Sequence, residues 1–368
     1  MTPQELTEAG LYDAAAADAD ERLELLDFLV SEGCSVEEMQ AALARGRLFA
    51  LAGDRQIKPL VGLLSLTEAA TQLECDPADL QRAWRTLGLP DQGIDTPLLT
   101  GPDVEAMQTY LDVRTFLGEE TALGVARVIG ASLARISEAE ASAMRQGMDT
   151  IDVARTGSEV ETAKAFSAVS RLVPRVGRML DAIHRQHLEA TRVHFEVMDI
   201  GDRAAFRCGV GFADLSGFTH LSHHLGLAEL SQVLSVFEEQ AADTVHARGG
   251  RTVKFLGDAV MWVAADPGAL AGIAHDLVTH PRALMEGIAV RAGIAHGLLL
   301  AQDGDYFGTP VNLASRLVAT ADPGQVLAPA ELAEVLGAGW SAVPKEAVVL
   351  RGFHDPVEVV ELTPSKAG

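Results

Sequence analysis

Apolar residues in the first half of the chain recur at intervals of three and four positions, the spacing that one face of an α-helix produces. The pattern extends from Thr2 to about Met198. Glycine and proline residues interrupt it near Gly53, Pro90–Gly93, Thr100–Asp103 and Gly147. Since such residues favour turns, we expect this half to be all-α, with eight or more helices joined by short loops.

Near Arg207 the pattern changes to alternating or continuous apolar runs, many of them β-branched, which favour strands. We expect strands over residues 208–212, 252–255, 259–263, 288–294, 326–327 and 357–362. Helical spacing separates them, over residues 217–247, 270–279, 310–319 and 330–336. Strands mixed with helices in this way predict an α+β or α/β domain built around a single sheet.

Three segments follow from these two patterns. A helical domain is expected over residues 1–162 and the sheet domain over residues 201–368. Residues 163–200 between them contain few helix breakers, so we expect one long helix, from about Ala163 to Phe195, that ends in a linker. A continuous helix in this place would transmit motion between the domains.

The composition is consistent with two domains and argues against some classes of function. The chain has 368 residues, enough for two domains that each bury a sizeable core. Its formal net charge is −23. An excess of this size argues against binding DNA or RNA, which requires a basic surface, and against docking on an anionic membrane by charge alone.

Cysteine usage and the N-terminus bear on the cellular compartment. Cys34, Cys75 and Cys208 are widely spaced and form no C-x-x-C pair, which is typical of a reducing cytoplasm and suggests no zinc site. The first residues carry acids where a signal peptide carries bases, and no apolar run approaches the roughly 20 residues needed to span a bilayer. We therefore expect a cytoplasmic protein with no membrane span.

Candidate chemistry begins where the first strong strand pattern ends. Asp214 follows the apolar run 210–213 and precedes the sequence L-S-G-F-T. A carboxylate at a strand end, followed by small residues that open a helix, suits a metal ion beside a phosphate held by backbone N–H groups. Taken alone, the same aspartate is equally suited to capping a helix.

A second carboxylate, Asp258, follows Gly257 between two apolar runs in the sequence K-F-L-G-D, which predicts a β-hairpin turn. By itself a Gly-Asp pair is ordinary turn chemistry. Lys254 adds a charge on the strand leading into this turn, and regular alternation puts it on one sheet face with Leu256 and Asp258. A single lysine there is also consistent with a solvated surface position.

The third group is the sequence D-Y-F-G-T-P-V-N-L-A-S-R, in which Asp305 precedes Thr309-Pro310, a typical helix start. Asn312 and Arg316 are four positions apart on that helix and therefore share one side. An amide and a guanidinium suit ribose and phosphate oxygens, although an exposed polar stripe has the same pattern. Together the three groups hold the residue types that bind a nucleoside triphosphate on two divalent metals and drive an internal phosphoryl transfer.

The order and spacing of the three groups closely resemble the catalytic domain of class III nucleotidyl cyclases, the family of adenylyl and guanylyl cyclases. The resemblance covers about residues 205–363, and residues 349–359 look like the family's closing β-hairpin. It implies an α+β fold with a mixed, mostly antiparallel sheet and flanking helices. The preceding helical half resembles the N-terminal regulatory regions of soluble actinobacterial cyclases, some of which restrain the catalytic domain and respond to pH.

The resemblance implies roles position by position. Metal binding falls to Asp214, Leu215 and Asp258. Adenine selection falls to Lys254 and Asp305, since a lysine donor and a carboxylate acceptor match the N1 and N6 edge of adenine. Asn312 and Arg316 correspond to the transition-state pair. The other implied nucleotide contacts are Ser216, Gly217, Phe218, Thr219 and Arg351.

The implied reaction converts ATP to 3′,5′-cyclic AMP and pyrophosphate with two Mg²⁺ or Mn²⁺ ions per site. Family sites lie between two catalytic domains, with the metal aspartates on one chain and the other four central residues on its partner, so the resemblance implies a homodimer. The competing interpretation is a sensor that binds a nucleotide in this fold without turnover. It is disfavoured because all six central positions are filled.

The helical half indicates less about function. His184, His187 and His194 cluster at the expected linker, and histidine changes charge between about pH 5 and 8, which makes them candidates for regulation by pH. Exposed histidines without a role would have the same pattern. A small-molecule or lipid ligand in the helical core is left open by the sequence.

A DNA-binding module is the alternative for residues 64–84, whose pattern is similar to a helix-turn-helix. The segment in the place of a recognition helix, residues 76–82, is not basic enough to hold phosphate, and the region around it is acidic. We therefore expect no nucleic acid partner.

Overall fold

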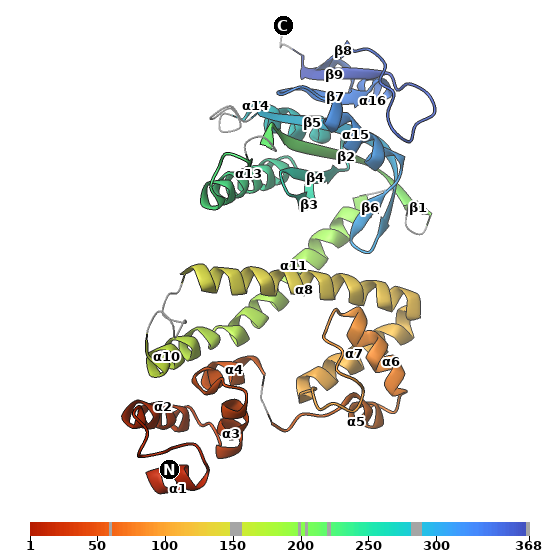
Figure 1. The fold of residues 1–368 in the computed structure, drawn as a ribbon. Helices are drawn as coiled ribbons and strands as arrows, with labels where there is room; N and C mark the ends of the chain where they lie inside the picture. Colours follow the sequence, from red (N-terminus) through yellow and green to blue (C-terminus); the bar gives the residue numbers. More distant parts are fainter. Residues whose placement is uncertain are drawn as a thin grey trace. The chain divides into compact units, whose positions relative to one another are not determined.

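The structure, a computed structural model, describes residues 1–58, 61–147, 157–197, 200–202, 205–218, 222–280 and 289–365. The chain forms two compact units, Met1–His187 and Leu188–Gly368 (Figure 1). Within the described residues, no helix combines the length and the apolar character needed to cross a membrane.

The named elements of the first unit are all helices, as the spacing of its apolar residues predicts. They are α1 (Pro3–Glu8), α2 (Ala19–Ser31), α3 (Val36–Ala44), the short 3₁₀ turn Leu48–Ala50, α4 (Leu51–Ile57), α5 (Leu66–Gln72), α6 (Pro77–Thr86), α7 (Gly101–Leu117), α8 (Glu119–Gly147), α10 (Glu159–Ser170) and α11 (Val173–Val197), which continues into the second unit. Side chains fix several of the starts: Thr2, Ser35, Ser65 and Thr100 each accept a hydrogen bond from the backbone three residues ahead.

Two apolar clusters form the interior of this unit. Leu25, Leu29 and Met39 belong to the cluster that α1 to α4 share with α10, while Leu80 and Trp84 belong to the one between α5, α6 and α7. Ion pairs add to the first cluster at its surface: Lys164 Nζ lies 2.9 Å from Glu24 Oε1, and Arg171 Nη2 lies 2.6 Å from Glu32 Oε1. Helix α10 is therefore an integral part of the N-terminal helical unit.

The single helix expected over residues 163–195 is wrong, because the chain forms two helices there. Helix α10 ends at Ser170 and α11 begins at Val173. Pro174 is the second residue of α11, where its missing N–H costs nothing; in a continuous helix it would have left the carbonyl of Ser170 without a donor. The break therefore follows from one proline, and α11 runs from the first unit into the second.

The second unit contains a sheet and flanking helices. Its elements are β1 (Ile200–Asp202), β2 (Ala205–Ser216), α13 (Leu227–Ala247), β3 (Arg251–Leu256), β4 (Ala259–Ala264), α14 (Pro267–Thr279), β5 (Ala289–Gln302), β6 (Asp305–Phe307), α15 (Thr309–Thr320), β7 (Val326–Pro329), α16 (Ala330–Leu336), β8 (Trp340–Pro344) and β9 (Val359–Pro364). In the described residues the main order is β3-β4-β2-β5-β7-β9-β8, with β1 beside β2 and β6 beside β5. Only the β5–β7 pair among these is parallel, which confirms the mixed, mostly antiparallel α+β fold.

The two faces of the sheet pack against different helices. Trp262 and Ile294 lie in the cluster formed with α13, α14 and α16, whereas Phe212 and Met261 lie in the cluster formed with α15. Helix α15 approaches β5 closely, since a Cβ on Gly293 would lie 2.3 Å from the backbone nitrogen of Val318. This glycine lets the helix lie directly on the strand, which fixes the position of the side chains that α15 carries.

Every strand expected from the sequence is present, but β1, β6 and β8 were not expected. The single helix expected over residues 217–247 is interrupted, because Phe218 and Ser222 are helical but residues 223–226 are not, and α13 begins at Leu227. Gly226 has an extended backbone and its N–H donates to Glu229 Oε2 at 3.0 Å, so the helix starts here.

Candidate active site

Asp214 lies near the end of the central strand β2, between β4 and β5. Its backbone is opposite Ala259 on one side and Arg291 on the other. Burial raises the pKa of the Asp214 carboxyl above its ordinary value, and the charge of Asp258 adds to this effect, while the hydrogen bond and charge of Arg291 oppose it. A partly buried carboxylate beside a second one is therefore present where the sequence predicted a metal ligand.

Arg291 is a residue of this site that the sequence did not reveal. Its Nη2 lies 2.9 Å from Asp214 Oδ2, and its Nη1 donates to the carbonyls of Ala319 and Ala321 at 3.2 and 3.4 Å. Those carbonyls belong to the end of α15. The only sequence signal was a basic residue in a strongly apolar strand, and its partner is distant along the chain.

Asp258 occupies the two-residue turn of the β3–β4 hairpin, as predicted. Gly257, the other turn residue, has a φ of +68°, the left-handed region that favours glycine. The backbone N–H of Leu215 donates to the carbonyl of Asp258 at 3.1 Å, which ties the turn to the end of β2. The two aspartates and Leu215 are thus held at the same end of neighbouring strands.

The donor set of this end suits a metal shared with a substrate. Asp214 and Asp258 offer hard oxygen ligands, and Mg²⁺ is commonly held by one or two carboxylates together with substrate phosphates. Across the part of the chain that the structure describes, no cluster of three or more His, Cys, Asp or Glu side chains is arranged to hold a metal.

The turn after β2 has space next to the backbone. Gly217 has a φ of +79°, and no heavy atom lies within 4 Å of a Cβ built on it. The Ser216 hydroxyl is buried without a hydrogen-bond partner among the described residues, and Phe218 packs on the core under α13 and α14. Thr219, the last residue expected here, lies outside the described residues.

Lys254 and Asp305 are brought together although 51 positions separate them along the chain. Lys254 Nζ forms an ion pair with Asp305 Oδ2, and the side chains are 34% and 30% exposed. The other oxygen, Asp305 Oδ1, accepts from the backbone N–H of Tyr306 at 2.9 Å. The pair that the resemblance assigns to adenine selection is therefore assembled within one chain and remains accessible.

Asn312 and Arg316 lie on α15, and both side chains are exposed. Their helix is held on β5 by the close contact at Gly293. The structure thus presents the two on the surface of the second unit. It does not bring them into contact with Asp214 or Asp258.

Arg351 is exposed in the long connection between β8 and β9. These strands pair antiparallel from Trp340↔Pro364 to Pro344↔Val360, so the hairpin is wider than residues 349–359. The expected hairpin segment forms its tip, where a bridge joins Val348 and Val357.

The candidate regulatory histidines lie on α11. His184 and His187 are exposed, and His184 directly precedes Arg185, which forms an ion pair with Asp181 whose closest atoms are 3.1 Å apart. His194 is on the same helix, and its side chain lies outside the described residues.

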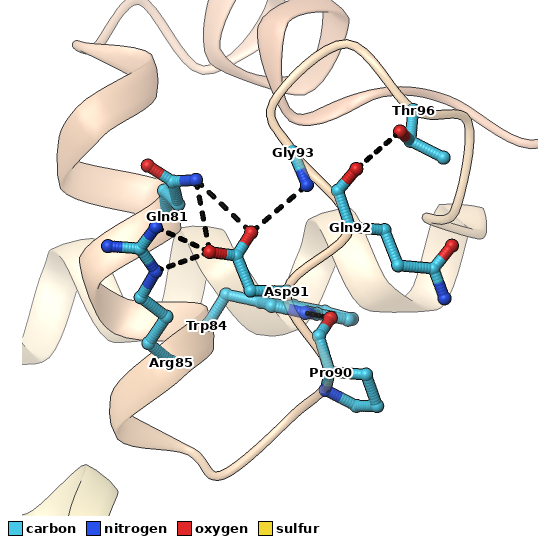
Figure 2. A network of polar contacts seen from close by, with 8 residues as sticks. All are labelled: Gln81, Trp84, Arg85, Pro90, Asp91, Gln92, Gly93 and Thr96. Atoms are coloured by element: carbon cyan, nitrogen blue, oxygen red, sulfur yellow. Dashed lines mark hydrogen bonds and ion pairs between the residues drawn. The ribbon is translucent and has the colours of Figure 1, made fainter.

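The residues with a helix-turn-helix pattern form α5 and α6, but the polar side chains of α6 are engaged within the unit. Figure 2 shows Asp91 accepting from Gln81 Nε2 at 3.1 Å, from Arg85 Nε at 2.6 Å and from the N–H of Gly93 at 3.1 Å. Arg82 forms an ion pair with Glu119. These carboxylates pair with cations of α6 that a recognition helix would direct at phosphate.

Comparison with known proteins places both units in one family. Residues 3–191 match the family model of the adenylate cyclase regulatory domain, and residues 203–363 match that of the adenylate and guanylate cyclase catalytic domain. An uncharacterized protein of Mycobacterium tuberculosis is 46% identical over 353 residues, which cover 96% of this chain and 93% of that protein.

Two named relatives agree with these matches. An adenylate cyclase of Streptomyces coelicolor is 37% identical over 264 residues, covering 69% of this chain and 67% of the relative. A pH-sensitive adenylate cyclase of Mycobacterium tuberculosis is 30% identical over 350 residues, covering 89% and 83%.

The sheet, with carboxylates at the end of β2 and a Lys–Asp pair between β3 and β6, defines the second unit as a nucleotidyl cyclase catalytic domain. The chain as a whole belongs to the adenylate cyclase family whose members join this domain to an N-terminal regulatory domain. The resemblance seen in the sequence is thereby confirmed in both halves.

Replacing Arg291 is expected to raise the pKa of Asp214 further. In Arg291→Gln the hydrogen bond and charge that lower this pKa are gone, while the burial that raises it remains. Carboxyl NMR titration of the metal-free full chain measures the shift. Because the folded pKa is raised, the contribution of Asp214 to stability is present at low pH and is lost as pH rises through that pKa.

The matched control is Arg248→Gln, which breaks the ion pair of Arg248 with Asp276 elsewhere in the same unit. It should leave the titration of Asp214 unchanged. A pKa of Asp214 that stays constant or falls in Arg291→Gln would show that the ion pair does not govern this carboxyl.

Proposed function

We propose that this protein converts ATP to 3′,5′-cyclic AMP and pyrophosphate, and that its N-terminal helical domain regulates the reaction. The observation that carries the choice of ATP is the accessible Lys254–Asp305 pair in a cyclase catalytic domain. A lysine donates to N1 of adenine and a carboxylate accepts from its 6-amino group, whereas guanine has the opposite donor and acceptor pattern at this edge. Relatives named adenylate cyclase support the same substrate.

In the proposed reaction the ribose 3′-oxygen attacks the α-phosphorus. The new O–P bond closes the ring, the bond to the β-phosphate oxygen breaks, and the 3′-hydroxyl proton is released. Asp214, Asp258 and the Leu215 carbonyl hold two Mg²⁺ or Mn²⁺ ions, which when bound lower the pKa of the 3′-hydroxyl and neutralise the leaving pyrophosphate.

The remaining residues orient the nucleotide. Asn312 orients the ribose, and Arg316 neutralises charge that develops on the reacting phosphate. Ser216, Gly217, Phe218 and Thr219 are assigned to the phosphates, and Arg351 is assigned to the terminal ones. The space beside Gly217 supports this assignment.

We infer that two copies of the chain complete each site. Asn312 and Arg316 are exposed on α15, on the surface of their own unit, and this supports their use by a partner subunit. The metal aspartates then come from one subunit, and Lys254, Asp305, Asn312 and Arg316 from the other. Such an isologous dimer has two identical sites.

Regulation is assigned to the helical half. We propose that residues 1–162 together with the rest of α10 form the regulatory domain, that α11 connects it to the second unit, and that residues 201–368 form the catalytic domain. The match of residues 3–191 to the adenylate cyclase regulatory domain supports the role, and the pH-sensitive relative supports pH as the signal. His184, His187 and His194 on α11 are the proposed titrating groups.

Turnover is the direct test. The full chain with ATP and Mg²⁺ or Mn²⁺ is expected to form cyclic AMP, and with GTP much less cyclic GMP, as measured by chromatography of the products. Tight binding of ATP by a folded dimer without product would contradict the enzyme and favour a nucleotide-binding sensor.

The shared site predicts complementation between two inactive variants. Asp214→Ala and Lys254→Ala, refolded or coexpressed together, should recover about a quarter of wild-type activity, because half of randomly formed dimers are mixed and each has one intact site of two. Asp214→Ala mixed with Asp258→Ala is the matched control, since both changes affect the metal side of a site and no intact site forms. Mixed dimers that stay inactive in the first pair would exclude the shared site.

The pH proposal is tested by replacing the three histidines in the full chain. His184→Gln, His187→Gln and His194→Gln together should flatten the activity profile between about pH 5 and 8, since neutral glutamine cannot titrate. His246→Gln, which changes an exposed histidine on α13, should leave the profile as it is. A triple variant with the wild-type profile would remove these residues from the mechanism.

A further inference from the structure

Two basic residues of β3 face the same side of the sheet although their spacing predicts opposite sides. Arg251 and Lys254 are three positions apart, and alternation alone would separate them. The pairing with β4 runs Arg251↔Val263, Thr252↔Trp262 and then Lys254↔Met261, so Val253 is an extra residue in the strand. This β-bulge turns both cations toward the face that holds Val263 and Met261.

On that face the two cations meet two consecutive residues of β6. Lys254 pairs with Asp305, and Arg251 Nη2 donates to the hydroxyl oxygen of Tyr306. The Arg251 guanidinium carbon lies 5.4 Å from the centre of the Tyr306 ring. Strand β6 is therefore joined to β3 at two adjacent points, although the two strands share no ladder.

Tyr306 is firmly anchored. Its side chain is 3% exposed and packs edge-on against Phe206, with the ring centres 5.8 Å apart. Burial raises the pKa of its phenol, so the hydroxyl remains neutral and available as an acceptor at physiological pH. Tyr306, buried and held by Arg251, is therefore fixed in position directly beside Asp305.

Strand β6 has little else to hold Asp305 in place. It has three residues, and among the described strands it pairs with β5 alone, from Leu300↔Phe307 to Gln302↔Asp305. The turn before it, Asp303-Gly304, has φ values of +52° and +76°, the geometry of a tight two-residue hairpin. Asp305 is thus the first residue after a hairpin turn that projects from the end of β5.

We propose that Arg251 and Tyr306 form a positioning pair that sets the Lys254–Asp305 pair in the geometry that distinguishes adenine from guanine. Neither residue is among those assigned to the base. Arg251 holds Tyr306, Tyr306 holds the backbone of its neighbour Asp305, and the bulge at Val253 brings both cations to one side. This inference rests on the proposed function, because it concerns the specificity of that reaction.

Tyr306→Phe in the full chain tests the pair. The change removes one hydroxyl and keeps the ring in the core. The ratio of kcat/KM for ATP to that for GTP is expected to fall by about tenfold, the lower end of what losing a hydrogen bond to a charged group produces. Most of the change should appear in KM for ATP.

Further variants separate positioning from packing. Arg251→Met keeps the length of the side chain and should lower the ratio to the same extent, and the double variant should lower it no further, because the two residues act as one unit. Arg251→Lys retains a donor and should restore part of the selectivity. Tyr110→Phe on α7 deletes a matched hydroxyl in the other unit and should change nothing.

Failure of the positioning role can be distinguished from failure of the proposed function. If the wild type makes cyclic AMP from ATP but Tyr306→Phe and Arg251→Met lower turnover of both nucleotides equally, or leave it unchanged, the positioning role is wrong while the function stands. If the wild type makes no product, the proposed function fails. The ratio of Kd for ATP to Kd for GTP, measured by calorimetry, then tests whether Arg251 and Tyr306 have the positioning role. An equal ratio in wild type and variants overturns it.

Discussion

The antiparallel pairing of β2 with β5 carries most of the candidate chemistry. The two strands pair continuously from Ala205↔Leu300 to Ser216↔Ala289. Asp214 and Arg291 are direct neighbours in this register, and β5 then leads into β6 and α15, which bear Asp305, Asn312 and Arg316. A slip of one residue would turn every side chain of β2 to the other face. Both faces of β2 are buried, so such a slip would exchange the residues that pack in the cluster with α13 and α14 for those that pack in the cluster with α15.

The active-site charges of this acidic protein are balanced locally. Asp214 pairs with Arg291 and Lys254 with Asp305, so the region around the nucleotide site contains opposite charges in contact. Both pairs are partly exposed, and exposed ion pairs typically contribute only about 0 to 1 kcal/mol to stability. Such pairs can therefore exchange partners when a charged ligand arrives without a large cost to the fold.

The sequence predicts what is encoded locally. The strands, the hairpin turn at Gly257-Asp258 and the helix start at Thr309-Pro310 each follow from a few consecutive residues, and all are present. Pro174 shows that a local signal was also missed, since its effect on the helix required only the chemistry of proline.

What the sequence does not predict depends on pairing between distant segments. Arg291 joins the site because the register of β5 puts it beside Asp214, and neither neighbour along the chain indicates this. The short strands β1 and β6 have too few residues for a periodicity to appear. The bulge at Val253 is invisible in the sequence for a similar reason: regular alternation gives Lys254 a face correctly but assigns Arg251 to the opposite one.

The contacts of Arg291 have one more consequence, for communication inside the catalytic domain. One end of its guanidinium holds Asp214, and the other holds the carbonyls of Ala319 and Ala321 at the last turn of α15. Those carbonyls have no helical donors of their own, so the arginine serves as the cap of the helix. A change in the charge on Asp214 therefore also affects the end of α15, because both contact the side chain of Arg291. The domain has a built-in link between the strand that carries a carboxylate and the helix that carries Asn312 and Arg316.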